Sequence, residues 1–138
     1  MSVVFITGAT KNSGLAIAEK FAKNGFDVAL SSRRLDDAEK TAKELAKTYK
    51  IKAKGYQLDL TDPSDIERVF KDIKLEFKRL DTFVANSANL GIGLGVLNSS
   101  PDDFDSVVDV NLKGTFFCTQ QAGHIMKEQG GGAIVYIS

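Results

Sequence analysis

The chain alternates short apolar runs with longer segments whose apolar residues recur every three or four positions. A short apolar run bounded by turn residues is typical of a buried strand, and the longer period is typical of a helix with one buried face. An interior glycine weakens a strand, and the third run contains Gly55. Strands are predicted at Val3–Ile6, Phe26–Ser31, Lys52–Asp59, Phe83–Ala85 and Ala133–Ile137.

The segments between these strands are predicted to be helices. The first runs from about Ser13 to Asn24 and stops at Gly25, a residue that suits the left-handed end of a helix. An acidic or hydroxyl residue, in two cases followed by proline, marks the start of each of the others. Those starts are Asp36 or Asp37, Asp62-Pro63 and Ser100-Pro101.

The last predicted helix is the longest and fades at Gly130–Gly132. Its apolar side chains recur at helical spacing, so we expect one face of the helix to be buried. Cys118 on this helix is expected to be a small core or interface residue, and His124 a surface residue. The expected inner face consists of Phe104, Val107, Val108, Leu112 and Phe116.

Alternation of strands and helices predicts a parallel sheet, because parallel strands must be joined by crossover connections. We therefore expect one α/β domain over residues 1–138, a doubly wound parallel sheet with helices on both faces. Ligands of such sheets bind beyond the carboxyl ends of the strands. The residues at those ends are Thr7-Gly8, Ser32-Arg33, Asp59-Leu60, Asn86 and Ser138.

The turn after the first strand is the strongest candidate for a binding site. It reads Thr7-Gly8-Ala9-Thr10-Lys11-Asn12-Ser13-Gly14 and leads directly into a helix. Unpaired backbone N–H groups and the positive end of the helix dipole meet at such a turn, and a side chain at either glycine would block a phosphate. We interpret the turn as a site for the pyrophosphate of a nucleotide cofactor. Its candidate contacts are Gly8, Thr10, Lys11, Asn12, Ser13 and Gly14.

Composition excludes several other classes of function. Eighteen Lys and Arg residues balance eighteen Asp and Glu residues, so no overall field favours nucleic acid or an anionic membrane, and we expect neither as a partner. The chain has one cysteine and one histidine, Cys118 and His124, too few for a disulfide, a metal cluster or a Ser-His-Asp triad. No long apolar run is present and Met1-Ser2 leads straight into a strand, so we expect a cytoplasmic protein.

Five segments carry a more specific pattern. They are the glycine turn; Asp59; Val84-Ala85-Asn86-Ser87-Ala88; Asn111 within Val110–Gly114; and Gly132–Ser138. In this order and spacing the sequence resembles the short-chain dehydrogenase/reductase family, whose motifs include TGxxxGxG and VNNAG. The resemblance implies a Rossmann-type sheet with strand order 3-2-1-4-5, truncated after the fifth strand. It also implies NAD(P)(H)-dependent interconversion of a carbonyl and an alcohol in a small molecule, and a homo-oligomer, tetramer or dimer, formed through the Asn111–Gln129 helix.

The chain departs from the family motifs at two places. Asn12 stands where the family usually has a second glycine, and asparagine tolerates left-handed backbone better than most side chains. Ala85 and Ala88 replace the first asparagine and the glycine of VNNAG, whereas Asn86 keeps the second asparagine. We therefore expect an unusual loop on the nicotinamide side of the site.

The charges after the second strand favour NADP(H) over NAD(H). An NAD site needs a carboxylate there for the ribose hydroxyls, and Ser31-Ser32-Arg33-Arg34 supplies none. Ser32 leaves room for a 2′-phosphate, Arg33 can bind it with two donors, and Lys11 can approach from the other side. The alternative is that Arg33 and Arg34 are merely solvated charges before a helix.

The family resemblance implies roles for the remaining candidates. Asp59 would accept from the adenine amino group, with Leu60 packed on the ring, unless Asp59 only caps the turn beside Thr61. Asn86, with Ser87 and Ala88, would bind the ribose and nicotinamide side, unless Asn86 is a purely structural turn residue. Asn111, a poor helix former inside a helix, would carry a water-linked proton relay.

The catalytic chemistry of the family also needs a serine just past the fifth strand and a Tyr-x-x-x-Lys pair. Tyr49, Tyr56 and Tyr136 lack a lysine four positions later, and the catalytic serine is either Ser138 or the next residue. We expect the N-terminal half of an NADP(H)-dependent oxidoreductase, inactive by itself. The alternative is a non-catalytic nucleotide-binding module that associates through its open sheet edge.

Overall fold

The computed structural model describes residues 1–138 and contains one sheet of five parallel strands. The order across the sheet is β3-β2-β1-β4-β5, which confirms the predicted Rossmann-type fold and strand order. Each strand begins and ends within one residue of its predicted bounds, except that β3 ends two residues earlier than predicted. The strands are β1 (Val3–Ile6), β2 (Asp27–Ser32), β3 (Ala53–Gln57), β4 (Thr82–Ala85) and β5 (Ala133–Tyr136).

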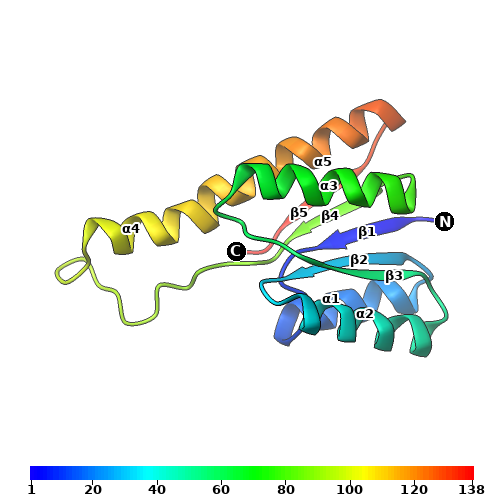
Figure 1. Ribbon diagram of the computed structural model, residues 1–138, viewed down its shortest axis with the longest axis horizontal. Helices are drawn as coiled ribbons and strands as arrows, with labels where there is room; N and C mark the ends of the chain where they lie inside the picture. Colours follow the sequence, from blue (N-terminus) through cyan, green and yellow to red (C-terminus); the bar gives the residue numbers. More distant parts are fainter.

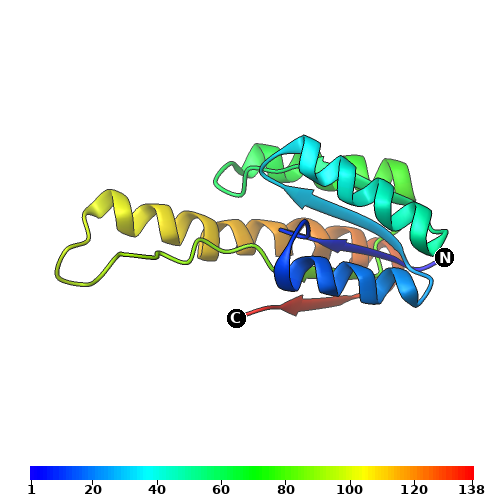
Figure 2. The ribbon, with the colours of Figure 1, turned by 90° about the horizontal axis from the view of Figure 1, so that it is seen from below.

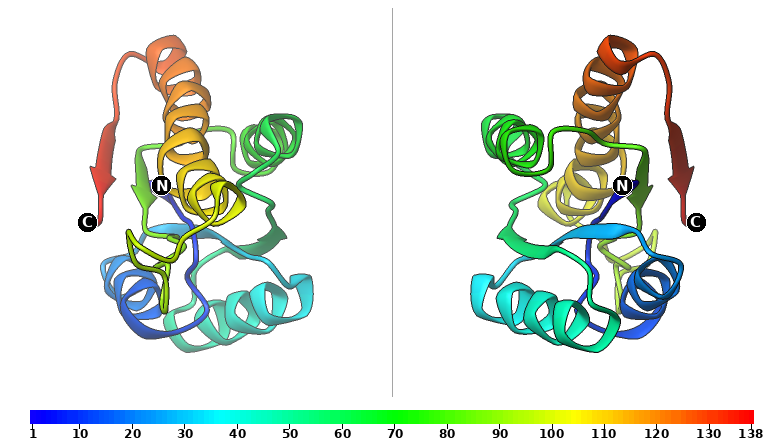
Figure 3. Two further views of the ribbon diagram at one scale, coloured as in Figure 1. Left: turned by 90° about the vertical axis from the view of Figure 1, so that its left-hand side faces the viewer. Right: turned by 90° about the vertical axis from the view of Figure 1, so that its right-hand side faces the viewer.

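Helices cover both faces of the sheet, as Figure 3 shows end-on. One face carries α1 (Asn12–Lys23) and α2 (Leu35–Tyr49). The opposite face carries α3 (Pro63–Phe77) and a long helical rod composed of α4 (Pro101–Val108), the π-helix η1 (Asp109–Gly114) and α5 (Thr115–Gln129). The rod and the loop before it extend past the carboxyl ends of the strands (Figure 1).

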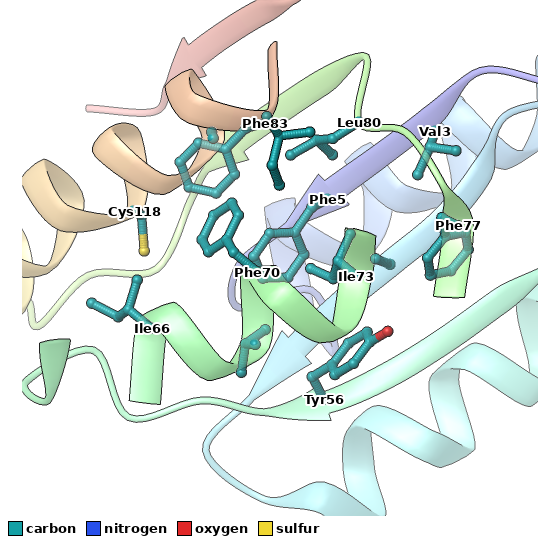
Figure 4. Close-up of a cluster of buried hydrophobic side chains, with 14 of the residues drawn as sticks. Val3, Phe5, Tyr56, Ile66, Phe70, Ile73, Phe77, Leu80, Phe83 and Cys118 are labelled. Carbon is teal, nitrogen blue, oxygen red and sulfur yellow. The ribbon is translucent and has the colours of Figure 1, made fainter. Parts of the chain in front are cut away.

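Each face of the sheet has its own hydrophobic core. Under α3 and α5, the rings of Phe5, Phe70 and Phe83 pack with centroids 5.1 to 5.7 Å apart (Figure 4). The predicted face of α3, Ile66, Val69, Phe70, Ile73 and Phe77, is fully buried there. Burying such side chains is the main free-energy gain of folding, at roughly 1.5 to 3 kcal/mol for each large one.

Gly55 does not weaken β3, contrary to the sequence expectation. The strand runs without a break from Ala53 to Gln57, and Gly55 is buried beneath α2. A Cβ at this position would lie 2.3 Å from the backbone carbon of Ala38. The glycine is therefore explained by the close approach of a helix to the sheet.

The prediction of which face of the longest helix is buried is wrong. Phe104, Leu112 and Phe116 are 66%, 68% and 61% exposed, whereas Val107 and Val108 are half-buried. Much of the rod runs past the sheet, where the loop before α4 and no strand lies beside it (Figure 2), and η1 changes the helical period midway. The side chains that α5 buries are smaller or flexible: Cys118, Ala122, Ile125 and Met126.

Asp81 links β1, β4 and β5 at the amino ends of these strands. Its Oδ2 accepts from the Val3 N–H at 2.8 Å, and its backbone bonds to Val3 and to Ala133. The Arg79 guanidinium hydrogen-bonds both carboxyl oxygens and holds the pKa of Asp81 below its ordinary value. The charged form of Asp81 therefore stabilises the junction of β1, β4 and β5.

We predict that Asp81→Asn lowers the free energy of unfolding by about 1 to 2 kcal/mol at pH 7, because a charge-assisted hydrogen bond is lost. A folded-state pKa below the unfolded value gives stability that is present above about pH 4 and lost as the pH falls further. Urea unfolding at pH 7 and pH 3 should show the gap between wild type and variant shrinking at the lower pH. The control is Asp105→Asn, at an exposed carboxylate with no ion pair; an equal loss in both variants would contradict the prediction.

Candidate functional site

Backbone pairing brings the carboxyl ends of three strands together around the glycine turn. The Ala9 N–H donates to the Ser31 carbonyl at 3.2 Å, and the Thr7 N–H donates to the Val84 carbonyl at 3.2 Å. The turn therefore lies directly between the end of β2 and the end of β4. The sequence-predicted residues Ser32-Arg33 and Asn86 follow those two contacts by one or two positions.

Thr7 is a central residue of this site. It was expected at the end of the first strand but was not among the candidate contacts of the turn. It is 2% exposed, and its Oγ1 accepts from the backbone N–H groups of Asn86 and Ser87, each at 3.1 Å. A buried hydroxyl needs such partners, and they fix the start of the β4–α4 loop against the turn. A threonine at the end of a buried strand was the available signal.

Gly8 and Gly14 are required by the packing of the turn itself. Gly8 has φ +64°, and a Cβ there would lie 2.6 Å from Ser87 Oγ. A Cβ on Gly14 would lie 2.1 Å from the Gly8 carbonyl oxygen and 2.6 Å from Asn86 Nδ2. From the sequence, a phosphate was expected in the space that these side chains would fill. The structure places the protein's own atoms there. The absence of side chains at the two glycines therefore lets α1, the glycine turn and the β4–α4 loop pack against one another.

The amino end of α1 has no side-chain cap. Its N-cap residue is Lys11, no acidic residue lies in its first turn, and Asn12 has φ +52° in the left-handed region. By contrast, Asp62 caps α3, and Ser100 with Asp103 forms a capping box on α4. The first N–H groups of α1 therefore have no capping side chain and remain available to an anion.

Asn86 links the β4 end to the glycine turn. Its Nδ2 donates to the Gly8 carbonyl at 3.1 Å, and its Oδ1 accepts from Ser13 Oγ at 3.3 Å. Both ends of the amide are thus engaged with the turn. This structural role of Asn86 corresponds to the simpler of the two sequence interpretations.

The basic residues around β2 and the turn are exposed. The Arg33 guanidinium and the Lys11 ammonium make no ion pair or hydrogen bond within the protein, whereas Arg34 lies 3.7 Å from Asp37. Ser32 Oγ accepts from the Arg34 N–H at 3.3 Å. Arg33 directly follows the small residue Ser32 at the end of β2, and Lys11 lies in the glycine turn.

Asp59 has a local structural role after β3. Its Oδ1 accepts from the Thr61 N–H at 2.9 Å and from Thr61 Oγ1 at 2.7 Å, which is the capping arrangement considered as the alternative. The second carboxyl oxygen has no partner in the protein. Leu60 is half-buried against the core below α3 and α5.

Asn111 lies in η1 and pairs with the backbone of Asn89. Its Oδ1 accepts from the Asn89 N–H and its Nδ2 donates to the Asn89 carbonyl, both at 2.8 Å. The Asn89 side chain in turn contacts Ser106 and Gly91. Both polar atoms of the Asn111 side chain are thus used to join the β4–α4 loop to the π-helix.

A family model for the short chain dehydrogenase matches residues 2–138. This chain belongs to the short-chain dehydrogenase family.

Several relatives of this chain are named for a polyol or a sugar. The NADP-dependent mannitol dehydrogenase of Hypocrea jecorina is 38% identical over 136 residues, covering 96% of this chain and 51% of that protein. L-sorbose reductase from Gluconobacter frateurii, complexed with NADPH and L-sorbose, has a TM-score of 0.91 at 25% identity, covering 98% of this chain and 51% of that one. NAD⁺-bound xylitol dehydrogenase has a TM-score of 0.92 at 27% identity, covering 98% and 52%. The chain thus spans about half the length of these relatives.

The single cysteine and the single histidine of the chain both lie on α5. Burial raises the pKa of the Cys118 thiol to about 12, which keeps it protonated and unreactive at neutral pH. His124 is exposed on α5, and no three His, Cys, Asp or Glu side chains gather closely enough to hold a metal ion. No helix combines the length and the apolar character needed to cross a membrane.

We predict that Gly14→Ala destabilises the protein by about 1 to 3 kcal/mol, because the new methyl group collides with the Gly8 carbonyl. Thermal or urea unfolding measures the change. The matched control is Gly123→Ala in α5, where a Cβ meets nothing within 4 Å and helix propensity favours alanine by up to about 1 kcal/mol. A Gly14→Ala variant as stable as wild type would show that the turn is packed differently.

Proposed function

We propose that residues 1–138 form the dinucleotide-binding domain of an NADP(H)-dependent oxidoreductase that interconverts a carbonyl and an alcohol in a small molecule. The observation that carries the proposal is the uncapped amino end of α1, placed by the glycine turn beside a strand end that bears Arg33 instead of a carboxylate. Membership of the short-chain dehydrogenase family supports the reaction class.

The glycine turn fits a pyrophosphate by its donor set. The amino end of α1 offers backbone N–H groups and the positive end of the helix dipole, without a carboxylate in the first turn to compete. Thr10, Asn12 and Ser13 supply the turn, and Asn86 holds it in place through Gly8 and Ser13. We assign the pyrophosphate to the first N–H groups of this helix.

The residues after β2 favour the 2′-phosphate of NADP(H). Relatives of both cofactor types match this chain, since the mannitol dehydrogenase is named NADP-dependent and the xylitol dehydrogenase is NAD⁺-bound, so the choice depends on the chain's own side chains. Ser32 is small, and the Arg33 and Lys11 side chains have no acidic partner within ion-pair distance. An NAD(H) site would instead need an acidic side chain here for the ribose hydroxyls.

The remaining candidates would position the two ends of the dinucleotide. The unpartnered oxygen of Asp59 and the side chain of Leu60 would hold the adenine, and Asn86, Ser87 and Ala88 would border the nicotinamide side. Asn111 would act by holding Asn89 and the loop in place, since both of its amide atoms are engaged there. The bound nicotinamide supplies or accepts the hydride.

Arg33→Ala is predicted to weaken NADPH binding about tenfold or more and to leave NADH binding nearly unchanged. The reason is the loss of charge-assisted hydrogen bonds to the 2′-phosphate, which contribute roughly 1.5 to 3 kcal/mol each. Isothermal titration calorimetry with both cofactors measures the ratio. Lys43→Ala, at an exposed lysine of α2 outside the site, is the control for charge alone. Equal affinities of the wild-type protein for NADPH and NADH would refute the cofactor assignment.

We also propose a homo-oligomer that covers the exposed apolar side chains of the helical rod. Light scattering should give at least the mass of a dimer at micromolar concentration, and Phe116→Glu should shift the protein towards monomer, because it would bury a charge. Leu75→Glu is the control, at a leucine of α3 that is 62% exposed. A monomeric wild-type protein would contradict the proposal.

A further inference from the structure

A polar cavity lies between the glycine turn and α2. Its volume is about 310 Å³, and no hydrophobic residue lines it. The turn contributes Thr10 and Lys11, and α2 contributes the remaining four residues, Asp37, Lys40, Thr41 and Glu44. Lys11, one of the two cations proposed to bind the 2′-phosphate, therefore shares a cavity with two carboxylates.

Of the two carboxylates, Asp37 is the one nearer to the end of β2. It lies in the first turn of α2, and Glu44 follows seven residues later, about 10 Å further along the helix axis. Asp37 also pairs with Arg34, its Oδ2 lying 3.7 Å from Arg34 Nε. Asp37 thus pairs with Arg34 near the end of β2 and also lines the cavity that contains Lys11.

We propose that Asp37 competes with the 2′-phosphate of the cofactor for Arg34 and Lys11, and so limits how strongly the site prefers the phosphorylated dinucleotide. The inference rests on the proposed function, because it assumes that the 2′-phosphate lies beside Ser32. Arg33, which has no acidic partner, then supplies the main contact, whereas Arg34 must exchange its weak pairing with Asp37 for the phosphate.

The physical size of the effect follows from the exposure of the ion pair. The side chains of Arg34 and Asp37 are 77% and 54% exposed, so their mutual attraction is weak and easily exchanged for a phosphate. Releasing Arg34 and removing a negative charge near Lys11 should strengthen binding of a 2′-phosphate by about two- to fivefold. Salt should reduce this gain, because exposed charges are screened over about 8 Å at physiological ionic strength.

The test compares adenosine 2′,5′-bisphosphate with 5′-AMP, which lacks the 2′-phosphate, in calorimetric titrations of the whole chain. Asp37→Asn should bind the bisphosphate about two- to fivefold more tightly than wild type at low salt, with AMP affinity unchanged and the gain smaller at high salt. Asp36→Asn is the matched control. It makes the same charge change one residue earlier, but Asp36 neither lines the cavity nor pairs with Arg34.

Three outcomes would overturn the inference. Asp37→Asn could leave the bisphosphate affinity unchanged, Asp36→Asn could produce an equal gain, or AMP affinity could rise to the same extent. A wild-type protein that binds the bisphosphate no better than AMP would instead refute the proposed function, and the inference with it.

Discussion

The buried hydroxyl of Thr7 links the glycine turn to the β4–α4 loop in the candidate site. Thr7 at the end of β1 accepts hydrogen bonds from the first two backbone N–H groups after β4, while Asn86 donates back to the Gly8 carbonyl. These bonds fix the glycine turn against the β4–α4 loop. Gly14 completes the joint, because only a residue without a side chain lets α1 approach the Gly8 carbonyl so closely. The position of the α1 amino end thus depends on this contact.

The contact leaves the amino end of α1 without a capping side chain, in contrast to α3 and α4. The amino end of α2 also lacks a side-chain cap, but Asp36 and Asp37 lie in its first turn, whereas α1 has no acidic residue there. Asp62 and Ser100 satisfy the first N–H groups of α3 and α4, whereas Lys11 offers α1 a positive charge and no acceptor. Unsatisfied donors at a helix end have a free-energy cost that a bound anion removes. The same edge carries Arg33 on one side and the loop after β4 on the other. The local electrostatics therefore favour a phosphorylated ligand although the chain has no net charge.

Local patterns in the sequence predicted the order and type of the elements well. Apolar runs and the Asp62-Pro63 cap act over a few residues, so they could be recognised without the fold. The exposure of Phe104, Leu112 and Phe116 could not be recognised in this way. Helical spacing reveals an apolar face of a helix, but it does not show whether the sheet extends beneath that face. The π-helix was also missed. The pairing of Asn111 with Asn89 was missed because it joins residues 22 positions apart. For the same reason, the sequence did not reveal that Gly8 and Gly14 face protein atoms.

The most direct test of the account is a titration of isotope-labelled protein with NADP⁺, followed by the backbone amide signals in two-dimensional NMR spectra. The account predicts that the largest shifts fall on Asn12, Ser13 and Gly14 at the amino end of α1, with a second group at Ser32 and Arg33. Saturable binding with the main shifts elsewhere, for example on α3 and α5, would contradict the claim that the glycine turn receives the pyrophosphate.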